Sequence, residues 1–290
     1  MDIVCINGEF VPHEKAEIPA SDAGLLLGEG VFETMRAEQG QILNAREHFK
    51  RLARGVRVME IPFQVEPEEL LALCEQTLDA NGLKEARVRL TLTRGPMRGH
   101  PASPGEGIPT LLITAVEFDQ RLAEDRERGW SVVSSEIPVN HLSPLATIKA
   151  TCYAEKTLAR RAARREGCEE AILYNIDGRL AEASMANVFI VRGDRLMTPP
   201  VEEGALPGTF REHLIRIAAD RGIAVQQVPI EDEEIDNATE IFLTNSVIEI
   251  MPVVKFDDEI VGTGAPGSMT RMLFQAHRLD VERALRSVKD

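Results

Sequence analysis

The sequence predicts a mixed α/β (α+β) protein built from two domains, and three observations support this fold class. The 290 residues, 43% of them hydrophobic, are enough for one large or two moderate cores. Segments with strand-like and helical patterns alternate along the chain. A polar, charged run divides them, so we expect a small N-terminal domain at 1–120, a linker at 121–129 and a larger domain at 130–290.

The N-terminal region should begin with a β-hairpin, because Gly8 separates two short strand-like stretches. Helices are expected where apolar residues recur at helical spacing and where a proline precedes a run that stops before Asn81-Gly82. In order, the predicted elements are strands at 3–7 and 9–12, a strand in the second half of 22–37 that leads to a turn at Gly40, helices at 44–60 and 67–80, and strands at 86–95 and 109–118. The last two strands flank a loop rich in Gly and Pro.

The C-terminal region should begin with a strand at Trp130 and then alternate helices and strands. Gly167 and Gly222 are expected to end two of these helices. The predicted helices are 152–166, 209–221 and 268–285, and the predicted strands are 171–175, 187–191, 224–228, 240–244 and 250–254. No G-x-G-x-x-G follows a strand, so a Rossmann nucleotide site is not supported.

Composition excludes several classes of partner. With 33 basic and 47 acidic residues, the net charge of -14 would repel nucleic acid and anionic membranes. No stretch approaches the ~18 apolar residues of a spanning helix, and the amino terminus lacks a signal pattern, so we expect a cytoplasmic protein without membrane contact. The scattered cysteines and histidines form no metal-binding motif, and we therefore expect no metal.

Lys149 is the first candidate catalytic residue. It lies between apolar Ile148 and Ala150, just before a predicted helix. Desolvation lowers the pKa of a lysine, and a deprotonated amine is what condensation with an aldehyde requires. A half-buried structural lysine is the alternative that these residues leave open.

The run from Lys149 to Val191 carries a long ordered pattern: a lysine opening a helix, a basic alanine-rich stretch, a glycine, a strand, D-G, an acidic residue and S-x-x-N-x-F. It reads IKATCYAEKTLARRAARREGCEEAILYNIDGRLAEASMANVFIV. This pattern resembles the fold-type IV pyridoxal-phosphate-dependent aminotransferases, which include branched-chain and D-amino acid aminotransferases and aminodeoxychorismate lyase. The resemblance implies a small α/β domain, a larger barrel-like α/β domain, pyridoxal 5′-phosphate as cofactor and a homodimer.

The resemblance also implies roles for cofactor-binding residues. Lys149 would be the Schiff-base lysine and the base that moves a proton from the substrate Cα. Glu182 would keep the pyridine nitrogen protonated, rather than being an exposed strand glutamate. The remaining cofactor contacts would come from Tyr153 near the phenolic oxygen, Arg51 of EHFKRL, Thr209 and Phe210 of ALPGTFREHL, and Ser246 and Val247 of FLTNSVIEIMPV.

The same resemblance suggests substrate contacts and a reaction. Phe32 and Arg36 of FETMR and Arg98 and His100 of TRGPMRGHP would bind the substrate. We expect ping-pong transamination through pyridoxamine phosphate, between a small α-amino acid and a 2-oxo acid such as 2-oxoglutarate. Tyr153 favours branched-chain-like substrates and Arg98-Gly99-His100 favours D-amino acids, so the handedness stays open. Aminodeoxychorismate lyase activity is the alternative reaction, and a non-catalytic cofactor-binding protein is the alternative class.

Overall fold

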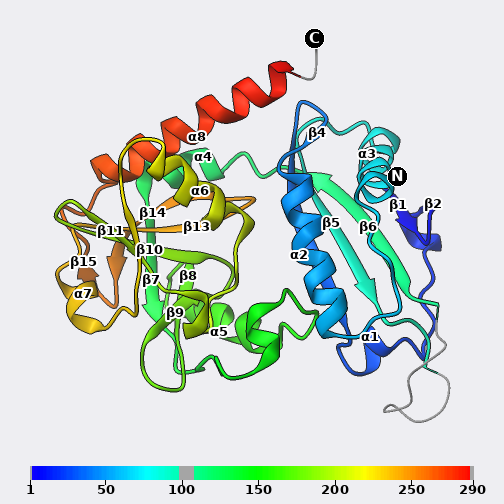
Figure 1. The fold of residues 1–290 in the computed structure, drawn as a ribbon, viewed down its shortest axis with the longest axis horizontal. Coiled ribbons are helices and arrows are strands. Elements are labelled where there is room, and N and C mark those ends of the chain that lie inside the picture. Colours follow the sequence, from blue (N-terminus) through cyan, green and yellow to red (C-terminus); the bar gives the residue numbers. More distant parts are fainter. Residues whose placement is uncertain (1, 98–107, 288–290) are drawn as a thin grey trace. The chain divides into compact units, whose positions relative to one another are not determined.

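The computed structural model describes residues 2–97 and 108–287 of the chain (Figure 1). The chain divides into two compact units. The first comprises the residues up to Phe118 together with Ile148–Cys152, and the second comprises Asp119–Thr147 and the residues from Tyr153 onward. Helix α4 (Leu122–Arg128) occupies most of the segment that the sequence suggests as a linker.

The first unit is built on a six-stranded antiparallel sheet with the order β2-β1-β6-β5-β3-β4. Its strands are β1 (Ile3–Ile6), β2 (Glu9–Pro12), β3 (Gly30–Glu38), β4 (Gln41–Ile42), β5 (Ala86–Thr93) and β6 (Thr110–Glu117); its helices are α1 (Ala23–Leu26), α2 (Ala45–Val58) and α3 (Pro67–Ala80), with a 3-10 turn at His13–Lys15. The predicted hairpin is confirmed, because Asn7 and Gly8 both adopt positive φ at its turn.

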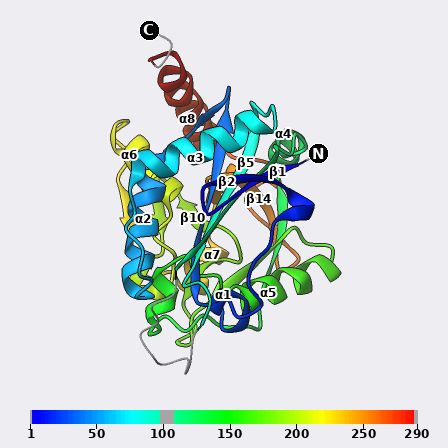
Figure 2. The same cartoon turned by 90° about the vertical axis from the view of Figure 1, so that its right-hand side faces the viewer.

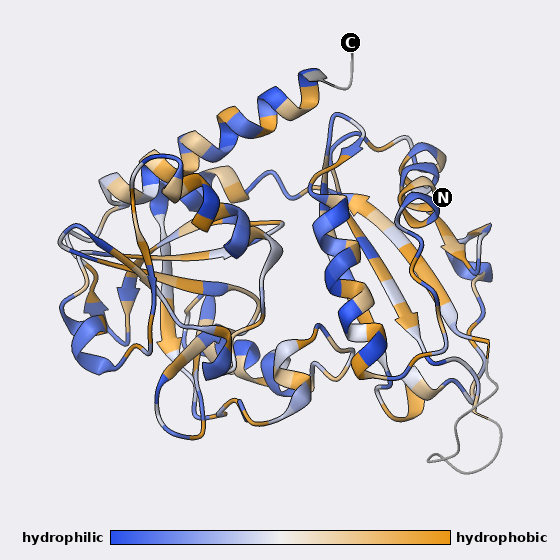
Figure 3. Ribbon diagram, in the orientation of Figure 1, coloured by the Kyte–Doolittle hydropathy of each residue, from blue (hydrophilic) through white to orange (hydrophobic). Residues whose placement is uncertain are grey.

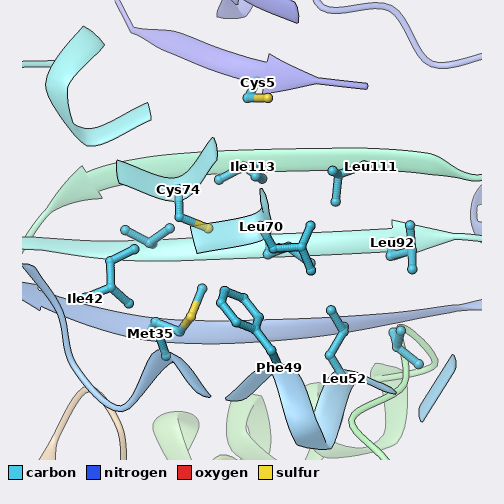
Figure 4. Packing of buried hydrophobic residues seen from close by; sticks show 14 of the residues in the cluster. Cys5, Met35, Ile42, Phe49, Leu52, Leu70, Cys74, Leu92, Leu111 and Ile113 are labelled. Carbon is cyan, nitrogen blue, oxygen red and sulfur yellow. The ribbon is translucent and has the colours of Figure 1, made fainter. Parts of the chain in front are cut away.

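Helix α3 has the predicted bounds for two local reasons. Pro67 occupies the first turn, where its missing N–H costs nothing, and Gly82 just beyond the helix takes a positive φ of 63°. Helices α2 and α3 pack on the sheet (Figure 2). Buried residues alternate with more exposed ones along β5, and the ribbon of Figure 3 is coloured by the hydropathy of each residue. Phe49 and Leu52 of α2 meet Met35 and Leu92 of the sheet in the core (Figure 4).

A short segment that includes Lys149 is attached to strand β3 of the first unit. The Phe32 N–H donates to the Lys149 carbonyl at 2.9 Å, and the Thr151 N–H donates to the Gly30 carbonyl at 2.8 Å. Ile148 and Ala150 on either side of the lysine are buried in the core of this unit. The sequence-based boundary assigns Lys149 to the C-terminal domain, whereas these backbone hydrogen bonds make it part of the first unit.

The second unit contains a nine-stranded mixed sheet with the order β12-β11-β10-β13-β14-β7-β8-β9, and β15 pairs with β14. Its strands are β7 (Trp130–Ser134), β8 (Glu170–Tyr174), β9 (Leu180–Ala183), β10 (Asn187–Arg192), β11 (Arg195–Thr198), β12 (Val225–Gln227), β13 (Glu240–Asn245), β14 (Glu249–Phe256) and β15 (Glu259–Ile260). Strands β9 and β10 follow each other along the chain, yet four strands separate them in the sheet. The sheet must therefore curve back on itself, as the barrel-like expectation requires.

Helices cover this sheet; three of them lie within two residues of the predicted ranges, whereas Leu122–Arg128 and Asp232–Asp236 were not predicted as helices. The helices are α4, α5 (Ala154–Arg165), α6 (Thr209–Ala219), α7 (Asp232–Asp236) and α8 (Ser268–Ser287), with 3-10 turns at Pro144–Thr147 and Val201–Glu203. Gly167 and Gly222 follow α5 and α6 with positive φ, as expected of glycines after a helix. Within residues 2–97 and 108–287, the helices are too short or too polar to cross a lipid bilayer.

Candidate active site

The first unit places Lys149 beside an aromatic ring and a second cation. The Lys149 Nζ lies 4.6 Å from the centroid of the Phe32 ring, and the guanidinium carbon of Arg89 lies 3.8 Å from the same centroid. Arg89 is on β5, opposite Thr34 of β3. The sequence reasoning missed Arg89. The sequence pattern could have indicated this residue. Arg87 and Arg89 alternate with the buried Val88 and Leu90, so both arginines point away from the core.

A buried ionic group holds Arg51 in the first unit. The Glu33 carboxylate accepts hydrogen bonds from Arg51 Nε at 2.8 Å, Arg51 Nη2 at 2.6 Å and His48 Nδ1 at 2.6 Å. Burial alone would raise the pKa of Glu33, but Arg51 and His48 lower it to about 2. Burial lowers the pKa of His48, although the neighbouring Glu33 carboxylate acts to raise it. Arg51 as a phosphate ligand stays a prediction, with its position set by Glu33.

The other predicted substrate residues are not all brought together. Arg36 Nη2 lies 3.1 Å from Glu38 Oε2, and its guanidinium carbon lies 4.0 Å from the Phe118 ring centroid. Arg36 lies four positions after Phe32 along the extended strand, a rise of about 13 Å. A substrate contact through Arg36 would compete with Glu38. Arg98 and His100 fall outside the described residues.

In the second unit, Glu182 is a buried carboxylate with two donors. It lies on β9 and is only 2% exposed, which removes the alternative of an exposed strand glutamate. Oε1 accepts from the Lys156 ammonium, and Oε2 accepts from the Leu206 N–H at 3.0 Å. A carboxylate has about four acceptor positions, so Glu182 retains capacity for a further donor. The Lys156 contact was not foreseen, although Lys156 follows Tyr153 by three residues on one helix face.

Tyr153 is linked to Glu182 through two neighbouring residues, Ser184 and Lys156. It occupies the N-cap position of α5, and its hydroxyl donates to the carbonyl of Ser184 at 3.0 Å. Ser184, two residues after Glu182, donates its own hydroxyl to buried Glu170. The Lys156 Nζ lies 5.2 Å from the Tyr153 ring centroid. Two predicted cofactor residues, Tyr153 and Glu182, thus belong to one hydrogen-bonded region.

The two predicted phosphate loops of the second unit, the first at residues 209–210 and the second at residues 246–247, lie side by side. Thr209 Oγ1 and Ser246 Oγ are 3.0 Å apart. Helix α6 begins at Thr209 without a side-chain cap, and its N-terminus is suited to an anion. The preceding Gly208 is required by close packing, since a Cβ there would lie 2.0 Å from Asn187 Oδ1. The sequence therefore brings two hydroxyls and a helix N-terminus to one place.

Two predicted phosphate residues have other contacts. The Val247 N–H donates to Asn245 Oδ1 at 2.8 Å, so a phosphate contact through that N–H would compete with the loop's own hydrogen bond. The Phe210 side chain is buried, 4.7 Å from the His277 ring, so its role in a cradle is confined to its backbone. Thr244, one residue before the loop, has a buried hydroxyl with no hydrogen-bond partner in the described part of the chain.

These features fit a phosphorylated heteroaromatic aldehyde. In the first unit Lys149 would supply a primary amine; in the second unit Glu182 would supply a buried acceptor for a ring N–H, and α6 with Thr209 and Ser246 an environment for a phosphate dianion. The fold and these groups define the class of pyridoxal-phosphate enzymes. The amino-transferase class IV family matches residues 30–256, more than half of the chain. The chain belongs to this family of fold-type IV, pyridoxal-phosphate-dependent aminotransferases.

Curated relatives and solved structures agree with this assignment. A putative branched-chain-amino-acid aminotransferase of Methanocaldococcus jannaschii is 33% identical over 93% of both chains, and a D-alanine aminotransferase of Staphylococcus haemolyticus is 28% identical over 97% of this chain and 99% of its own. The Escherichia coli branched-chain amino acid aminotransferase structure matches with a TM-score of 0.90 at 28% identity, covering 94% of this chain and 92% of its own.

Two further structures bear on cofactor and reaction. Another branched-chain amino acid aminotransferase, solved with pyridoxamine 5′-phosphate, matches with a TM-score of 0.86 at 28% identity, covering 93% of this chain and 91% of its own. A putative 4-amino-4-deoxychorismate lyase of Legionella pneumophila matches with a TM-score of 0.85 at 25% identity, covering 92% of this chain and 97% of its own. The predicted fold class, enzyme class and cofactor are confirmed.

Proposed function

We propose that this enzyme transfers an amino group between a small α-amino acid and a 2-oxo acid such as 2-oxoglutarate. The observation that carries the proposal is the buried Glu182 carboxylate, held by Lys156 and the Leu206 N–H in a chain of this family. When bound, pyridoxal 5′-phosphate supplies an electron sink for the bond broken at the substrate Cα. An anionic partner at the ring nitrogen is what such a sink requires.

The residues of this chain have separate tasks in the proposed reaction. Lys149 Nζ would take the proton from the substrate Cα as general base and would return it as general acid during amino transfer. Glu182 keeps the proton on the ring nitrogen. Tyr153 contacts the phenolic oxygen, and Thr209, Ser246 and the α6 N-terminus hold the phosphate, with Arg51, Phe210 and Val247 as further proposed contacts.

Substrate recognition in the first unit is proposed to involve Phe32 and Arg89. The Arg89 guanidinium and the Lys149 amine contact the same Phe32 ring, so a carboxylate bound by Arg89 would belong to the molecule whose Cα proton Lys149 removes. Arg36, Arg98 and His100 remain proposed substrate contacts. A homodimer in the cytoplasm, with small molecules as its only partners, is part of the same proposal.

The substrate is proposed to be a branched-chain-like amino acid or a D-amino acid. Both classes are supported by relatives, since branched-chain and D-alanine aminotransferases each match almost the whole chain. The test is to mix the pyridoxal-phosphate-loaded protein with single L- and D-amino acids and to follow the absorbance of the bound cofactor. Conversion by one class and not the other assigns the handedness, and no conversion by any amino acid would remove the proposal.

Aminodeoxychorismate lyase activity is the second candidate, supported by the Legionella neighbour. It would release pyruvate and 4-aminobenzoate from aminodeoxychorismate with the same lysine. Incubation with that substrate distinguishes the two reactions. Release of pyruvate together with no amino transfer from the amino acid panel would favour the lyase.

The role of Lys149 has its own test. Borohydride reduction of the loaded protein, followed by peptide mass spectrometry, should find the cofactor mass on the peptide that contains Lys149. Lys149→Ala should lose turnover and release the cofactor on dialysis. Lys50→Ala is the control, because that lysine is exposed and paired with nearby Glu47. Attachment to a different lysine would contradict the assignment.

A further inference from the structure

A buried ionic cluster lies directly after the second phosphate loop, and the reaction itself does not use it. Glu249, the first residue of β14, is 2% exposed. Its carboxylate lies 3.1 Å from His277 Nε2, 2.9 Å from Arg278 Nη1 and 3.3 Å from Arg126 Nη2. Helix α8 contributes His277 and Arg278, and α4 contributes Arg126. Three separate elements thus meet at one carboxylate.

Arg126 also holds the backbone of the loop. Its Nη2 donates to the Ile248 carbonyl and its Nε donates to the Ile250 carbonyl, both at 2.9 Å. Its guanidinium carbon lies 4.2 Å from the Phe274 ring centroid on α8. On the other side of the loop, Asn245 Oδ1 accepts from the Ile248 N–H at 2.8 Å. The stretch after Ser246 is therefore fixed from both ends.

The cluster continues to the first phosphate loop through α6. His277 Nδ1 lies 3.2 Å from His213 Nε2, and the rings of both histidines face the Phe210 ring edge to face. Burial, with a contribution from His277, lowers the pKa of His213 to about 4, so this histidine is neutral at physiological pH. Phe210 follows Thr209 at the start of α6. The chain of contacts thus runs from α8 to both loops that carry the phosphate hydroxyls.

The contribution to folding stability alone does not account for a buried ionic cluster of this kind. Burying several charges is costly, and an apolar set of similar volume is often as stable. Glu249 also has a φ of 59°, a left-handed conformation that non-glycine residues rarely adopt. Strained backbone that is held by many contacts is typical of functional loops. The geometry of the loop, rather than folding energy, is what these contacts determine.

We propose that Glu249, with Arg126 and His277, is a positioning residue for the phosphate end of the cofactor. The cluster fixes the backbone beside Ser246 and keeps this loop against the N-terminus of α6. It rests on the proposed function in one respect, because it assumes that these loops receive the cofactor phosphate. No residue of the cluster touches the reacting atoms. Its effect is expected in the affinity for the phosphate group.

The test compares two probes that differ only in that group, pyridoxal 5′-phosphate and pyridoxal. Both are titrated into the cofactor-free protein, and the ratio of their dissociation constants measures the phosphate contribution. Glu249→Gln should weaken pyridoxal 5′-phosphate binding by ~10-fold or more, about 1.4 kcal/mol, and leave pyridoxal binding within ~2-fold. A purely structural role would weaken both probes together or neither, and either result would overturn the proposal.

Glu240→Gln is the matched control for loosening of α8. Glu240 accepts from the N–H groups of Met269 and Thr270 at the start of that helix, away from the residues of the cluster. The Glu240→Gln substitution should leave the ratio of the two dissociation constants unchanged. An equal fall of the ratio in this control would assign the effect to α8 as a whole and contradict the role of Glu249. Should Glu249→Gln not accumulate as folded protein, His277→Gln provides the same comparison, with a smaller fall expected.

The outcome is independent of whether amino transfer is observed. A wild-type protein that binds pyridoxal 5′-phosphate far more tightly than pyridoxal but transfers no amino group would contradict the proposed function and still allow the cluster to be tested. An unchanged ratio in Glu249→Gln, in a protein that does transfer amino groups, overturns this inference alone. A wild-type protein with equal affinity for the two probes overturns it as well.

Discussion

Each unit of this protein buries a carboxylate near a proposed cofactor residue, but the two carboxylates have different surroundings. Glu33 in the first unit is bonded by Arg51 and His48, with a guanidinium donating to both of its oxygens. Glu182 in the second unit accepts one ammonium contact and one backbone N–H. The side chains of both are almost fully buried. Burial alone therefore does not distinguish a structural acid from one that is proposed to bind the cofactor.

The difference lies in how many donors each carboxylate already has. Glu33 is neutralised within the protein, and its main effect is to fix Arg51. Glu182 has fewer protein donors, which suits an acid that must also bind the ring N–H of a cofactor. We therefore expect changes at Glu182 to affect catalysis first and changes at Glu33 to affect stability first. The following predictions test that distinction.

Glu182→Gln should have the largest effect. A neutral amide does not keep the ring nitrogen protonated, so we expect kcat to fall by about 10²- to 10⁴-fold with a smaller change in KM. Steady-state kinetics with the best amino donor measure this. Glu203→Gln is the control, because Glu203 is also buried in the second unit and bonded to Arg179 and Asn175. Similar losses of kcat in both variants would contradict the assignment.

Glu33→Gln should cost about 3–5 kcal/mol of the free energy of unfolding, because it leaves the Arg51 guanidinium buried without its partner. The single tryptophan and both tyrosines belong to the second unit, so their fluorescence does not report on the first. Hydrogen exchange of the β3 and β5 amides is the suitable measurement. Glu47→Gln, at an exposed pair with Lys50, should change these amides little.

Lowering the pH should remove the contribution of Glu33 to the free energy of unfolding. Its pKa is about 2 in the folded protein against an ordinary value of 4.5, so its stabilisation is complete above pH 4.5 and is lost as the pH falls toward 2. The lowered pKa of His48 acts in the same direction below pH 6.5. The difference in unfolding free energy between the wild type and Glu33→Gln should shrink over this range. A difference that stays constant from pH 6 to pH 2.5 would contradict the ionic account of this cluster.

Lys156→Met should have the smallest effect, about 1–3 kcal/mol on the stability of the second unit. The lysine side chain is 21% exposed, so water compensates part of the lost contact with Glu182. The unfolding transition followed by Trp130 fluorescence measures it. Lys255→Met removes a more exposed pair with Asp258, where water screens the charges, and should leave stability almost unchanged. Equal losses of stability in the two variants would show that the Lys156–Glu182 pair stabilises the protein no more than an exposed pair does.

Much of the fold could be predicted because its signals are local. Pro67 and Asn81-Gly82 mark both ends of α3, and Asn7-Gly8 marks the first hairpin. The position of Lys149 could not be predicted in the same way. Its attachment to β3 depends on backbone hydrogen bonds between segments more than a hundred residues apart, and backbone groups leave no trace in the side-chain pattern.

Residues of the candidate site could be predicted where the family pattern includes them. Their hydrogen-bond and ion-pair partners could not be predicted in this way. Thr209 and Ser246 lie 3.0 Å apart, and Tyr153 is linked to Glu182 only through Ser184 and Lys156, so their cofactor roles stay predictions. The pairing of Arg51 with Glu33 was missed. A signal existed, because Glu33 falls on the inward side of β3 between buried Val31 and Met35, where an acid needs a cationic partner.

The attachment of Ile148–Cys152 to β3 has a consequence for how this gene can evolve. The chain passes from one unit to the other three times, so no single crossover in the gene can exchange one unit intact. Recombination at residue 118 would supply a foreign β3 while keeping the native lysine segment. We therefore expect the Ile148–Cys152 segment and strand β3 to be inherited together from one ancestor.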